Sequence, residues 1–229
     1  MKYKAVIFDL FGTLVDKFPI DESINILKQM AVVLDVSARD LVKLWFETFD
    51  ERHGGDFKNL REDINYVCGK LGAYPDDKKV RHAAQINLDY VAKSIKPRPS
   101  AVETLTCLRE HGYKVGLISN WSDEVPTVWN DIPLSRLFDV AVFSCRVGSM
   151  KPDSRIYLLA AEQLEVKPEE CIYIGDGDSK ELKGAELVGM HPVLINANGE
   201  DSEHPANIEA EEWKGERITS LAEIKTLLG

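Results

Sequence analysis

Short apolar runs alternate with helical patterns through most of this 229-residue chain. Five runs have the length and apolar content of buried strands, at residues 5–8, 115–118, 140–143, 171–174 and 192–195. Patterns with helical spacing accompany the later runs, at residues 101–111, 122–130, 154–164 and 180–187. Because strands that alternate with helices form parallel sheets with helices on both faces, we expect an α/β fold built on a doubly wound parallel sheet.

Residues 18–96 interrupt this alternation. They contain four stretches of helical pattern, at 20–34, 38–49, 60–71 and 78–92, without a convincing strand among them. The segment Lys96-Pro97-Arg98-Pro99 predicts a return linker, since each proline disfavours helix at the residue before it. We therefore expect an α/β core of residues 1–17 and 97–229 and an all-helical domain of residues 18–96. In the tail, 196–213 is expected to be irregular and 220–228 helical.

The formal net charge of −10 argues against a nucleic-acid-binding protein, which needs clustered lysine and arginine. The first predicted strand begins close to Met1, and no apolar stretch is long enough to cross a bilayer. Four scattered cysteines without C-x-x-C spacing predict buried thiols in a reducing compartment. These features predict a cytoplasmic protein that binds neither membranes nor nucleic acid, and they do not indicate its oligomeric state.

Polar side chains follow four of the predicted strands, where a parallel sheet would bring them to one edge. In chain order they are Asp9 and Thr13, Ser119 and Asn120, Lys151, and finally Asp176 and Glu181. Ligands of open α/β sheets bind just beyond the carboxyl ends of the strands. A nucleophilic carboxylate, a hydroxyl and an ammonium suit phosphoryl transfer, and paired acids suit Mg²⁺. This edge of the sheet is therefore the predicted active site.

The order and spacing of these segments resemble the haloacid dehalogenase-like (HAD) hydrolase superfamily. The resemblance covers nearly the whole chain and rests on four segments: Phe8-Asp9-Leu10-Phe11-Gly12-Thr13-Leu14, Ile118-Ser119-Asn120, Met150-Lys151-Pro152-Asp153 and Gly175-Asp176 to Gly184-Ala185. It implies a Rossmann-like core and identifies the helical insertion as the family's mobile cap domain.

The resemblance also implies a role for each segment. Asp9 is the nucleophile that becomes covalently modified, Thr13 orients it, and the backbone N–H groups of Leu10 and Phe11 cradle the phosphate. In the second segment, Ser119 bonds a phosphate oxygen beside Asn120.

The resemblance also implies which groups pair with charge and bind metal. Lys151 holds the nucleophile and the substrate charge together, while Asp9, the Phe11 carbonyl and Asp176 bind Mg²⁺. Glu181 supports this metal site without binding the ion directly. The expected substrate is a small phosphorylated molecule, and an aspartyl-phosphate forms at Asp9.

Phe11 departs from the family's phosphatases, which carry an acid there to protonate the leaving group and activate water. Loss of such a group costs about 10² to 10⁴ in rate. The family's haloacid dehalogenases have an aromatic residue at this position. However, after Leu44-Trp45 this chain has Phe46, where those enzymes place an arginine for the substrate carboxylate.

Three functions therefore remain open. The cluster of Asp176, Asp178 and Glu181 favours a magnesium-dependent phosphohydrolase, because a cation would relieve its negative charge. The alternatives are a 2-haloacid dehalogenase acting on a halogenated substrate, and a binding protein on this scaffold that has lost turnover. Without an acid at Phe11, a phosphohydrolase should favour acyl or aryl phosphates.

Three further side chains are close in sequence to these segments. His53 precedes Gly54-Gly55 and could supply a substitute acid or a substrate contact, although a solvated loop histidine is the expected state. Trp121 is expected to pack beside the site, and Asp16 to have a structural role.

Overall fold

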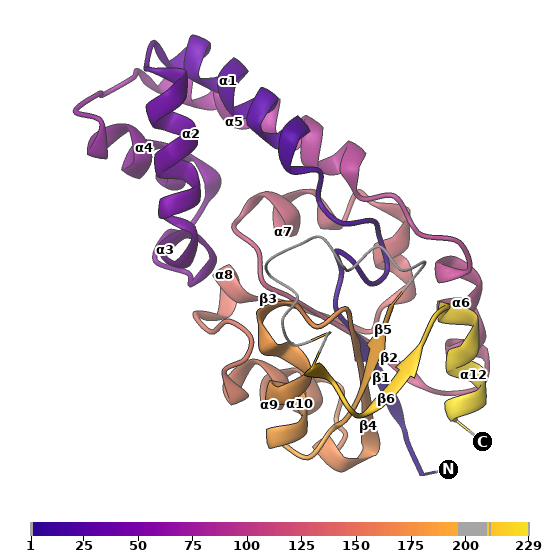
Figure 1. Ribbon diagram of the computed structural model, residues 1–229. Coiled ribbons are helices and arrows are strands. Elements are labelled where there is room, and N and C mark those ends of the chain that lie inside the picture. Colours follow the sequence, from indigo (N-terminus) through magenta and orange to yellow (C-terminus); the bar gives the residue numbers. More distant parts are fainter. Residues whose placement is uncertain (1, 197–209, 211, 229) are drawn as a thin grey trace.

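A sheet of six parallel strands forms the centre of the computed structural model, which describes residues 2–196, 210 and 212–228 (Figure 1). Across the sheet the strands lie in the order β3-β2-β1-β4-β5-β6. Their bounds are β1 (Ala5–Phe8), β2 (Lys114–Ser119), β3 (Val140–Phe143), β4 (Cys171–Gly175), β5 (His191–Ile195) and β6 (Glu216–Ile218).

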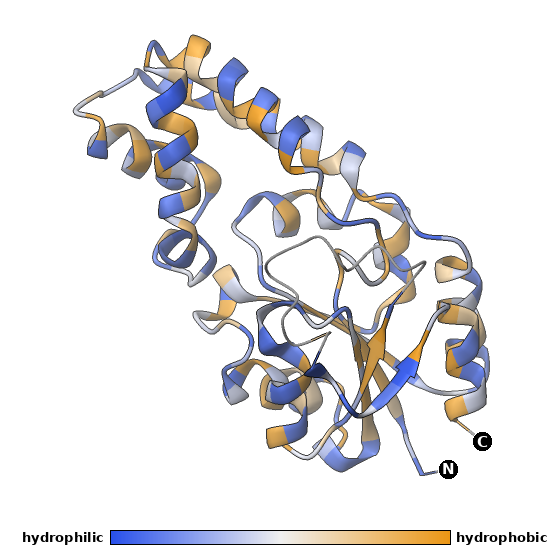
Figure 2. Cartoon of the chain, in the orientation of Figure 1, coloured by the Kyte–Doolittle hydropathy of each residue, from blue (hydrophilic) through white to orange (hydrophobic). Residues whose placement is uncertain are grey.

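Both faces of the sheet are covered by helices, so the expectation of a doubly wound α/β fold is confirmed. Alternate residues of β1 explain this: Val6 and Phe8 belong to one buried cluster, and Ala5 and Ile7 to another on the opposite face. The helices of the core are α6 (Ala101–Glu110), α7 (Glu124–Trp129), α8 (Ser144–Val147), α9 (Ser154–Gln163), α10 (Glu181–Leu187) and α12 (Ile224–Leu227). Hydrophobic side chains of α6, α7 and α12 cover the first face, and those of α9 and α10 cover the second. Figure 2 shows that the strands of the sheet are mostly hydrophobic, whereas the helices alternate between hydrophobic and hydrophilic residues.

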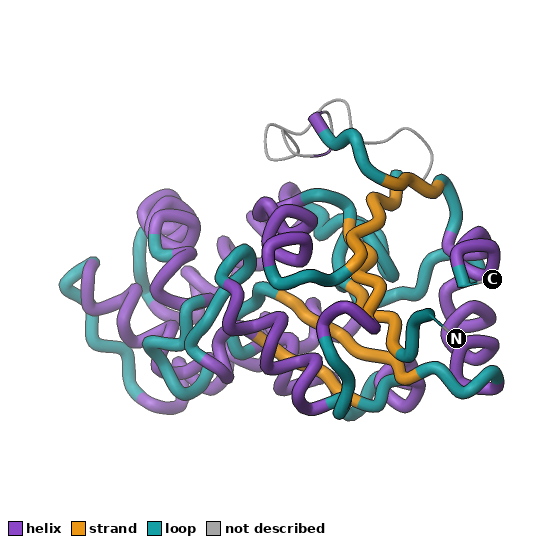
Figure 3. Tube along the Cα trace, turned by 90° about the horizontal axis from the view of Figure 1, so that it is seen from below, coloured by secondary structure: helices purple, strands orange, loops and turns teal. Residues whose placement is uncertain are grey.

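Residues 20–94 form five helices that project from one end of the sheet (Figures 1 and 3). They are α1 (Ile20–Leu34), α2 (Ala38–Glu47), α3 (Phe49–His53), α4 (Leu60–Lys70) and α5 (Asp77–Ser94). Capping side chains define two of the N-termini: Asn59 accepts from two amides of α4, and Asp76 accepts from the Lys79 amide at 2.9 Å. These helices bury a hydrophobic cluster of their own, which includes Met30, Leu41 and Ile64.

The structure corrects three of the predicted elements. The expected helix of residues 38–49 is interrupted at Thr48, whose hydroxyl donates to the Leu44 carbonyl at 2.7 Å, and α3 begins afterwards. Strand β6 was not predicted, because its three residues include only one buried side chain, Ile218. At the C-terminus, the predicted helix 220–228 begins as a 3₁₀ turn before α12. Such turns occur at Pro133–Leu137, Pro168–Glu170, Asp178–Lys180 and Leu221–Glu223.

Two smaller expectations have different outcomes. All four cysteines are free, and three of them are buried, but Cys107 is partly exposed. Most of the tail expected to be irregular, residues 197–209 and 211, lies outside the described residues. No described helix combines the length and the apolar character that a bilayer crossing requires.

Candidate active site

The strand register brings the polar segments to one edge of the sheet. Phe8 pairs with Leu117 of β2 and with Ile174 of β4, so the residues after these strands lie at one level. The Asp9 amide donates to the Ile174 carbonyl at 2.9 Å, and Asp176 follows β4 directly. The chain runs outward from β1 through β2 and β3, then returns to the other side of β1 at β4. Asp9 and Asp176 therefore lie at the topological switch point, where open α/β sheets bind ligands.

Lys151 is the centre of a buried hydrogen-bonded group at this edge. Its ammonium donates to Asp9 Oδ1 at 2.5 Å and to Glu181 Oε2 at 2.6 Å. Tyr173 of β4 donates its hydroxyl to the same Glu181 oxygen at 2.7 Å. Burial lowers the pKa of Lys151, but the negative charges of Asp9 and Glu181 raise it by a larger amount. The ammonium therefore stays charged. Asn120 fixes the backbone of Lys151 by accepting from its amide at 2.8 Å and donating to its carbonyl at 3.0 Å.

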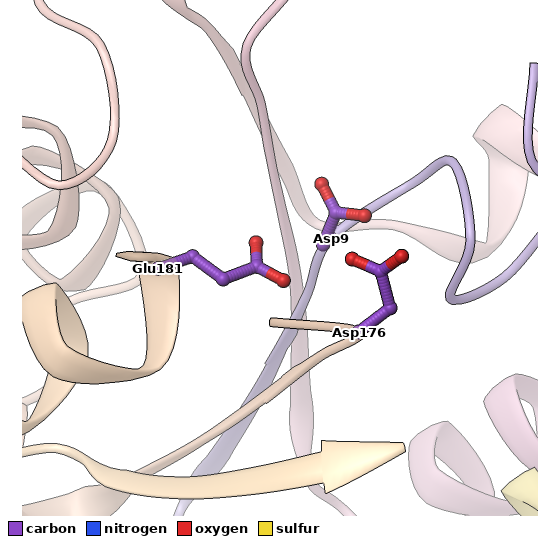
Figure 4. Close-up of side chains that lie close together, drawn as sticks. All are labelled: Asp9, Asp176 and Glu181. Atoms are coloured by element: carbon purple, nitrogen blue, oxygen red, sulfur yellow. The ribbon is translucent and has the colours of Figure 1, made fainter. Parts of the chain in front are cut away.

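Three buried carboxylates face one another at the site: Asp9, Asp176 and Glu181, each with an oxygen within 4.8 Å of the others (Figure 4). Burial raises the pKa of all three, and Lys151 opposes this at Asp9 and Glu181. At Asp176 the neighbouring Asp9 and Asp178 add to the effect of burial, and its pKa rises to about 7. This set of oxygen donors, with more negative than positive charge, fits a hard divalent cation.

Glycines allow these carboxylates to approach the backbone. Gly12 has a φ of +86°, and a Cβ there would lie 2.2 Å from Asp176 Oδ2. A Cβ on Gly175 would lie 2.1 Å from Glu181 Oε1. The turn after Asp9 thus packs directly against the Asp176 carboxylate, and a larger residue in either place would displace an acid of the site.

Arg98 holds this turn from the return linker. Its guanidinium donates to the Gly12 carbonyl at 2.6 Å and to Asp16 at 3.2 Å, in line with the structural role expected of Asp16. Thr13 is fully buried beside Asp9, and its hydroxyl has no hydrogen-bond partner within the described part of the chain. An uncompensated hydroxyl at this depth is costly unless a ligand completes it.

Phe11 belongs to an aromatic cluster between the sheet edge and the helices of residues 20–94. Its ring stacks on Trp121, with centroids 4.4 Å apart, and meets Phe18 edge-on at 5.3 Å. Trp121 therefore packs beside the site, as expected. The Phe11 side chain is thus held by packing against two other aromatic rings.

A second buried polar cluster lies where these helices meet the core. Arg52 of α3 donates to the Ser122 hydroxyl at 3.1 Å, and Ser122 donates to Glu124 at 2.5 Å. Asn87 of α5 donates to the other Glu124 oxygen at 3.0 Å. On α4, burial followed by the charge of Glu124 raises the pKa of Asp63 to about 8, although Arg52 opposes this.

His53 is buried in this region, so the expectation of a solvated loop histidine is wrong. It is the last residue of α3, and its ring stacks on Phe49 at 3.7 Å. Burial, followed by the charge of Arg52, lowers the pKa of His53 well below its usual value. A neutral imidazole is a poor substitute for the missing acid.

The geometry brings the sequence-predicted residues together around Asp9, while their catalytic roles stay predictions. The sequence analysis did not identify Tyr173, Arg98 or Lys17, whose ammonium lies 3.7 Å from Asp176. Tyrosine within an apolar strand and arginine in a proline-rich linker were the available signals. Neither signal indicates a partner, because these contacts join segments far apart in the chain.

Known proteins provide an independent comparison. The model of the haloacid dehalogenase-like hydrolases matches residues 3–189. A glyceraldehyde 3-phosphate phosphatase of Methanopyrus kandleri is 30% identical over 212 residues, which cover 89% of this chain and 88% of the relative. The (S)-2-haloacid dehalogenase 4A of Burkholderia cepacia is 28% identical over a match that covers 98% of this chain and 94% of that relative. Among solved structures, a HAD phosphatase from Thermococcus onnurineus matches with a TM-score of 0.69 and 24% identity, over 99% of this chain and 98% of that one.

Proposed function

Because this chain belongs to the haloacid dehalogenase-like hydrolases, we propose that it is a magnesium-dependent phosphohydrolase acting on a small phosphorylated molecule. The single observation that carries the proposal is the acidic group of Asp9, Asp176 and Glu181. Displacement of halide from carbon has no need for a metal, whereas a phosphoryl group brings negative charge that a cation must offset. The resemblance to a glyceraldehyde 3-phosphate phosphatase supports the same substrate class.

The proposed reaction has two balanced steps. In the first, a carboxylate oxygen of Asp9 attacks phosphorus, and the bond from phosphorus to the leaving oxygen breaks with its electron pair. In the second, water attacks phosphorus, its proton passes to solvent or to the departed leaving-group oxygen, and the bond from phosphorus to the Asp9 oxygen breaks. This step releases inorganic phosphate and restores the Asp9 carboxylate. Lys151 lies 2.5 Å from Asp9, where it can hold the nucleophile against the negative phosphoryl group.

The residues present fit a magnesium ion held by Asp9, the Phe11 carbonyl and Asp176, with Glu181 behind them. Such an ion supplies charge neutralisation of the phosphoryl oxygens. Within the chain, Thr13 and the N–H groups of Leu10 and Phe11 would orient the nucleophile and phosphate. Ser119, which is buried at the end of β2, would bond a phosphate oxygen. Residues 18–96 would act as the cap that excludes water from this edge.

Phe11 determines which phosphates can react. Its ring is occupied by stacking on Trp121, and it supplies no proton to the leaving group. Substrates with leaving groups that depart without full protonation, such as acyl and aryl phosphates, should therefore react faster than alkyl phosphates. Equal rates for aryl and alkyl phosphates would contradict this account of Phe11.

Phe11 also favours the second candidate, a 2-haloacid dehalogenase, because a halide leaves without a proton. In that reaction Asp9 would attack carbon instead of phosphorus. The relative from Burkholderia cepacia supports this alternative, while the acid pair of Asp176 and Glu181 opposes it.

The test is the turnover of p-nitrophenyl phosphate and acetyl phosphate, with and without Mg²⁺, beside an Asp9→Asn control. Metal-dependent release that disappears in the control supports phosphoryl transfer through Asp9. If neither phosphate is hydrolysed, chloride release from L-2-chloropropionate tests the dehalogenase. Failure of both assays would favour a binding protein that has lost turnover.

A further inference from the structure

A cavity of ≈ 90 Å³ lies between α1, α2, α3, α5 and the segment after β2. Its wall includes the aromatic side chains of Phe18, Trp45, Phe46, Phe49 and Trp121. The cavity adjoins the nucleophile turn, because Trp121 stacks on Phe11, two residues after Asp9. A wider hollow of ≈ 960 Å³ beside α10 and β6 is lined by neither Asp9 nor any residue of the helical insertion.

The charge on the cavity wall is already balanced. Arg52 reaches Glu124 through the Ser122 hydroxyl and donates to the Trp45 carbonyl at 2.6 Å. Its guanidinium also lies over the Trp45 ring, 4.1 Å from the centroid. His53 is neutral. A substrate carboxylate placed here would have no unpaired cation among the lining residues to pair with, so its burial would be costly. The wall therefore suits a neutral group.

His53 offers this wall a polar atom that can bind such a group. His53 Nδ1 lies 2.8 Å from the Phe49 carbonyl, which can only accept, so Nδ1 carries the proton. In a neutral imidazole the other nitrogen, Nε2, is then an acceptor. Within residues 2–196, 210 and 212–228 Nε2 has no hydrogen-bond partner, and stacking on Phe49 holds the ring in place.

Resting on the phosphohydrolase function proposed above, we propose that this cavity receives the leaving group of the substrate and that His53 Nε2 accepts a hydrogen bond from its hydroxyl. In the bound substrate, the group that this cavity receives is neutral and carries one hydroxyl. His53 acts in substrate specificity rather than as an acid.

The experiment compares two acyl phosphates of the same carbon chain, lactoyl phosphate with a hydroxyl and propionyl phosphate without one. For the unmodified protein, kcat/KM should be about 3- to 10-fold higher for lactoyl phosphate, the usual effect of one neutral hydrogen bond. His53→Phe keeps a stacking ring without Nε2, and the ratio should fall to about 1. His53→Gln restores an acceptor and should keep part of the preference. His82→Phe, at an exposed position of α5, is the matched control and should keep the full ratio.

A preference that persists in His53→Phe, or a ratio near 1 in the unmodified protein, would overturn the proposal. Binding separates this failure from failure of the proposed function. In an Asp9→Asn variant, quenching of Trp45 and Trp121 fluorescence reports the dissociation constants of both phosphates. If neither phosphate is hydrolysed, the proposed function fails, and the ratio of the two dissociation constants then tests the proposed role of the cavity. Tighter binding of lactoyl phosphate that requires His53 supports this role, and equal affinity for both phosphates overturns it.

Discussion

Two buried polar clusters in this protein differ in charge and in origin. The cluster at the sheet edge places the buried ammonium of Lys151 among three carboxylates, and Lys17 lies 3.7 Å from one of them, Asp176. Asp9 and Asp176 follow strands directly, whereas Glu181 begins α10.

The second cluster lies where the helices of residues 20–94 meet the core. Its Arg52 is linked to Glu124 through the Ser122 hydroxyl, and it also contains Asp63, whose raised pKa favours the neutral form. Its side chains come from α3, α4, α5 and the start of α7.

The difference separates a cluster with unbalanced charge from one that is close to balanced. Buried charge without a full complement of partners is unfavourable unless a ligand or ion completes it. The sheet edge has this deficit, together with the unpaired hydroxyl of Thr13. The second cluster is close to balanced and joins α3 and α5 to the core through Ser122 and Glu124. Phe11 and Trp121 lie between them.

The largest effect is expected from Lys151→Met, which leaves Asp9 and Glu181 as buried carboxylates without their cation. The free energy of unfolding should fall by about 3 to 5 kcal/mol, measured by urea denaturation. Turnover should be lost. Adding Glu181→Gln should recover part of the stability without restoring turnover. A Lys151→Met protein as stable as the unmodified one would mean that the cluster is not held by this ammonium.

Phe11→Asp places an acid between the two clusters, at the position where the leaving group would depart. The turnover of alkyl phosphates should rise by about 10²-fold, because the new carboxyl can protonate the leaving oxygen. Phe11→Asn is the control, since it removes the ring without supplying an acid. An equal increase in both variants would attribute the effect to the lost ring.

Arg52→Met tests the second cluster by removing its cation. Glu124 keeps its hydrogen bonds from Asn87 and Ser122, so the loss of stability should be smaller, about 1.5 to 3 kcal/mol. Amides of α3 should exchange faster with deuterium. The exposed Arg39 of α2 offers a matched control, and Arg39→Met should change neither quantity. Unchanged exchange in Arg52→Met would show that this cluster does not hold the cap.

The smallest effect concerns Asp63 and pH. Burial and Glu124 raise its folded pKa to about 8, so between about pH 4 and pH 8 the folded state keeps a proton that the unfolded state has lost. Stability should therefore decrease as pH rises, by about 1 kcal/mol between pH 6 and pH 7. Asp63→Asn should lack this contribution to the decrease, and Asp40→Asn, at an exposed position, should retain it. Parallel curves for the unmodified and Asp63→Asn proteins would contradict the assignment.

Most of the fold was predictable because its signals are local. Burial on both faces produces continuous apolar runs, and the runs ending at Phe8, Ile118, Phe143 and Ile174 became strands with similar bounds. The break at Thr48 was missed, since a side-chain bond to Leu44 competes with an otherwise continuous helical pattern. Strand β6 was missed because an edge strand buries too little to leave a pattern.

The sequence by itself determined that Asp9, Ser119, Lys151 and Asp176 lie at one edge of the sheet, because parallel strands share the direction in which they end. Only the tertiary structure decided what surrounds them. Lys17, Tyr173 and Arg98 reach the site across turns and linkers whose geometry no periodicity encodes. His53 became buried, and Arg52 found Glu124, because helices of the insertion pack against the core. Such contacts depend on how separate units dock, and that information is spread over many residues rather than written in any one segment.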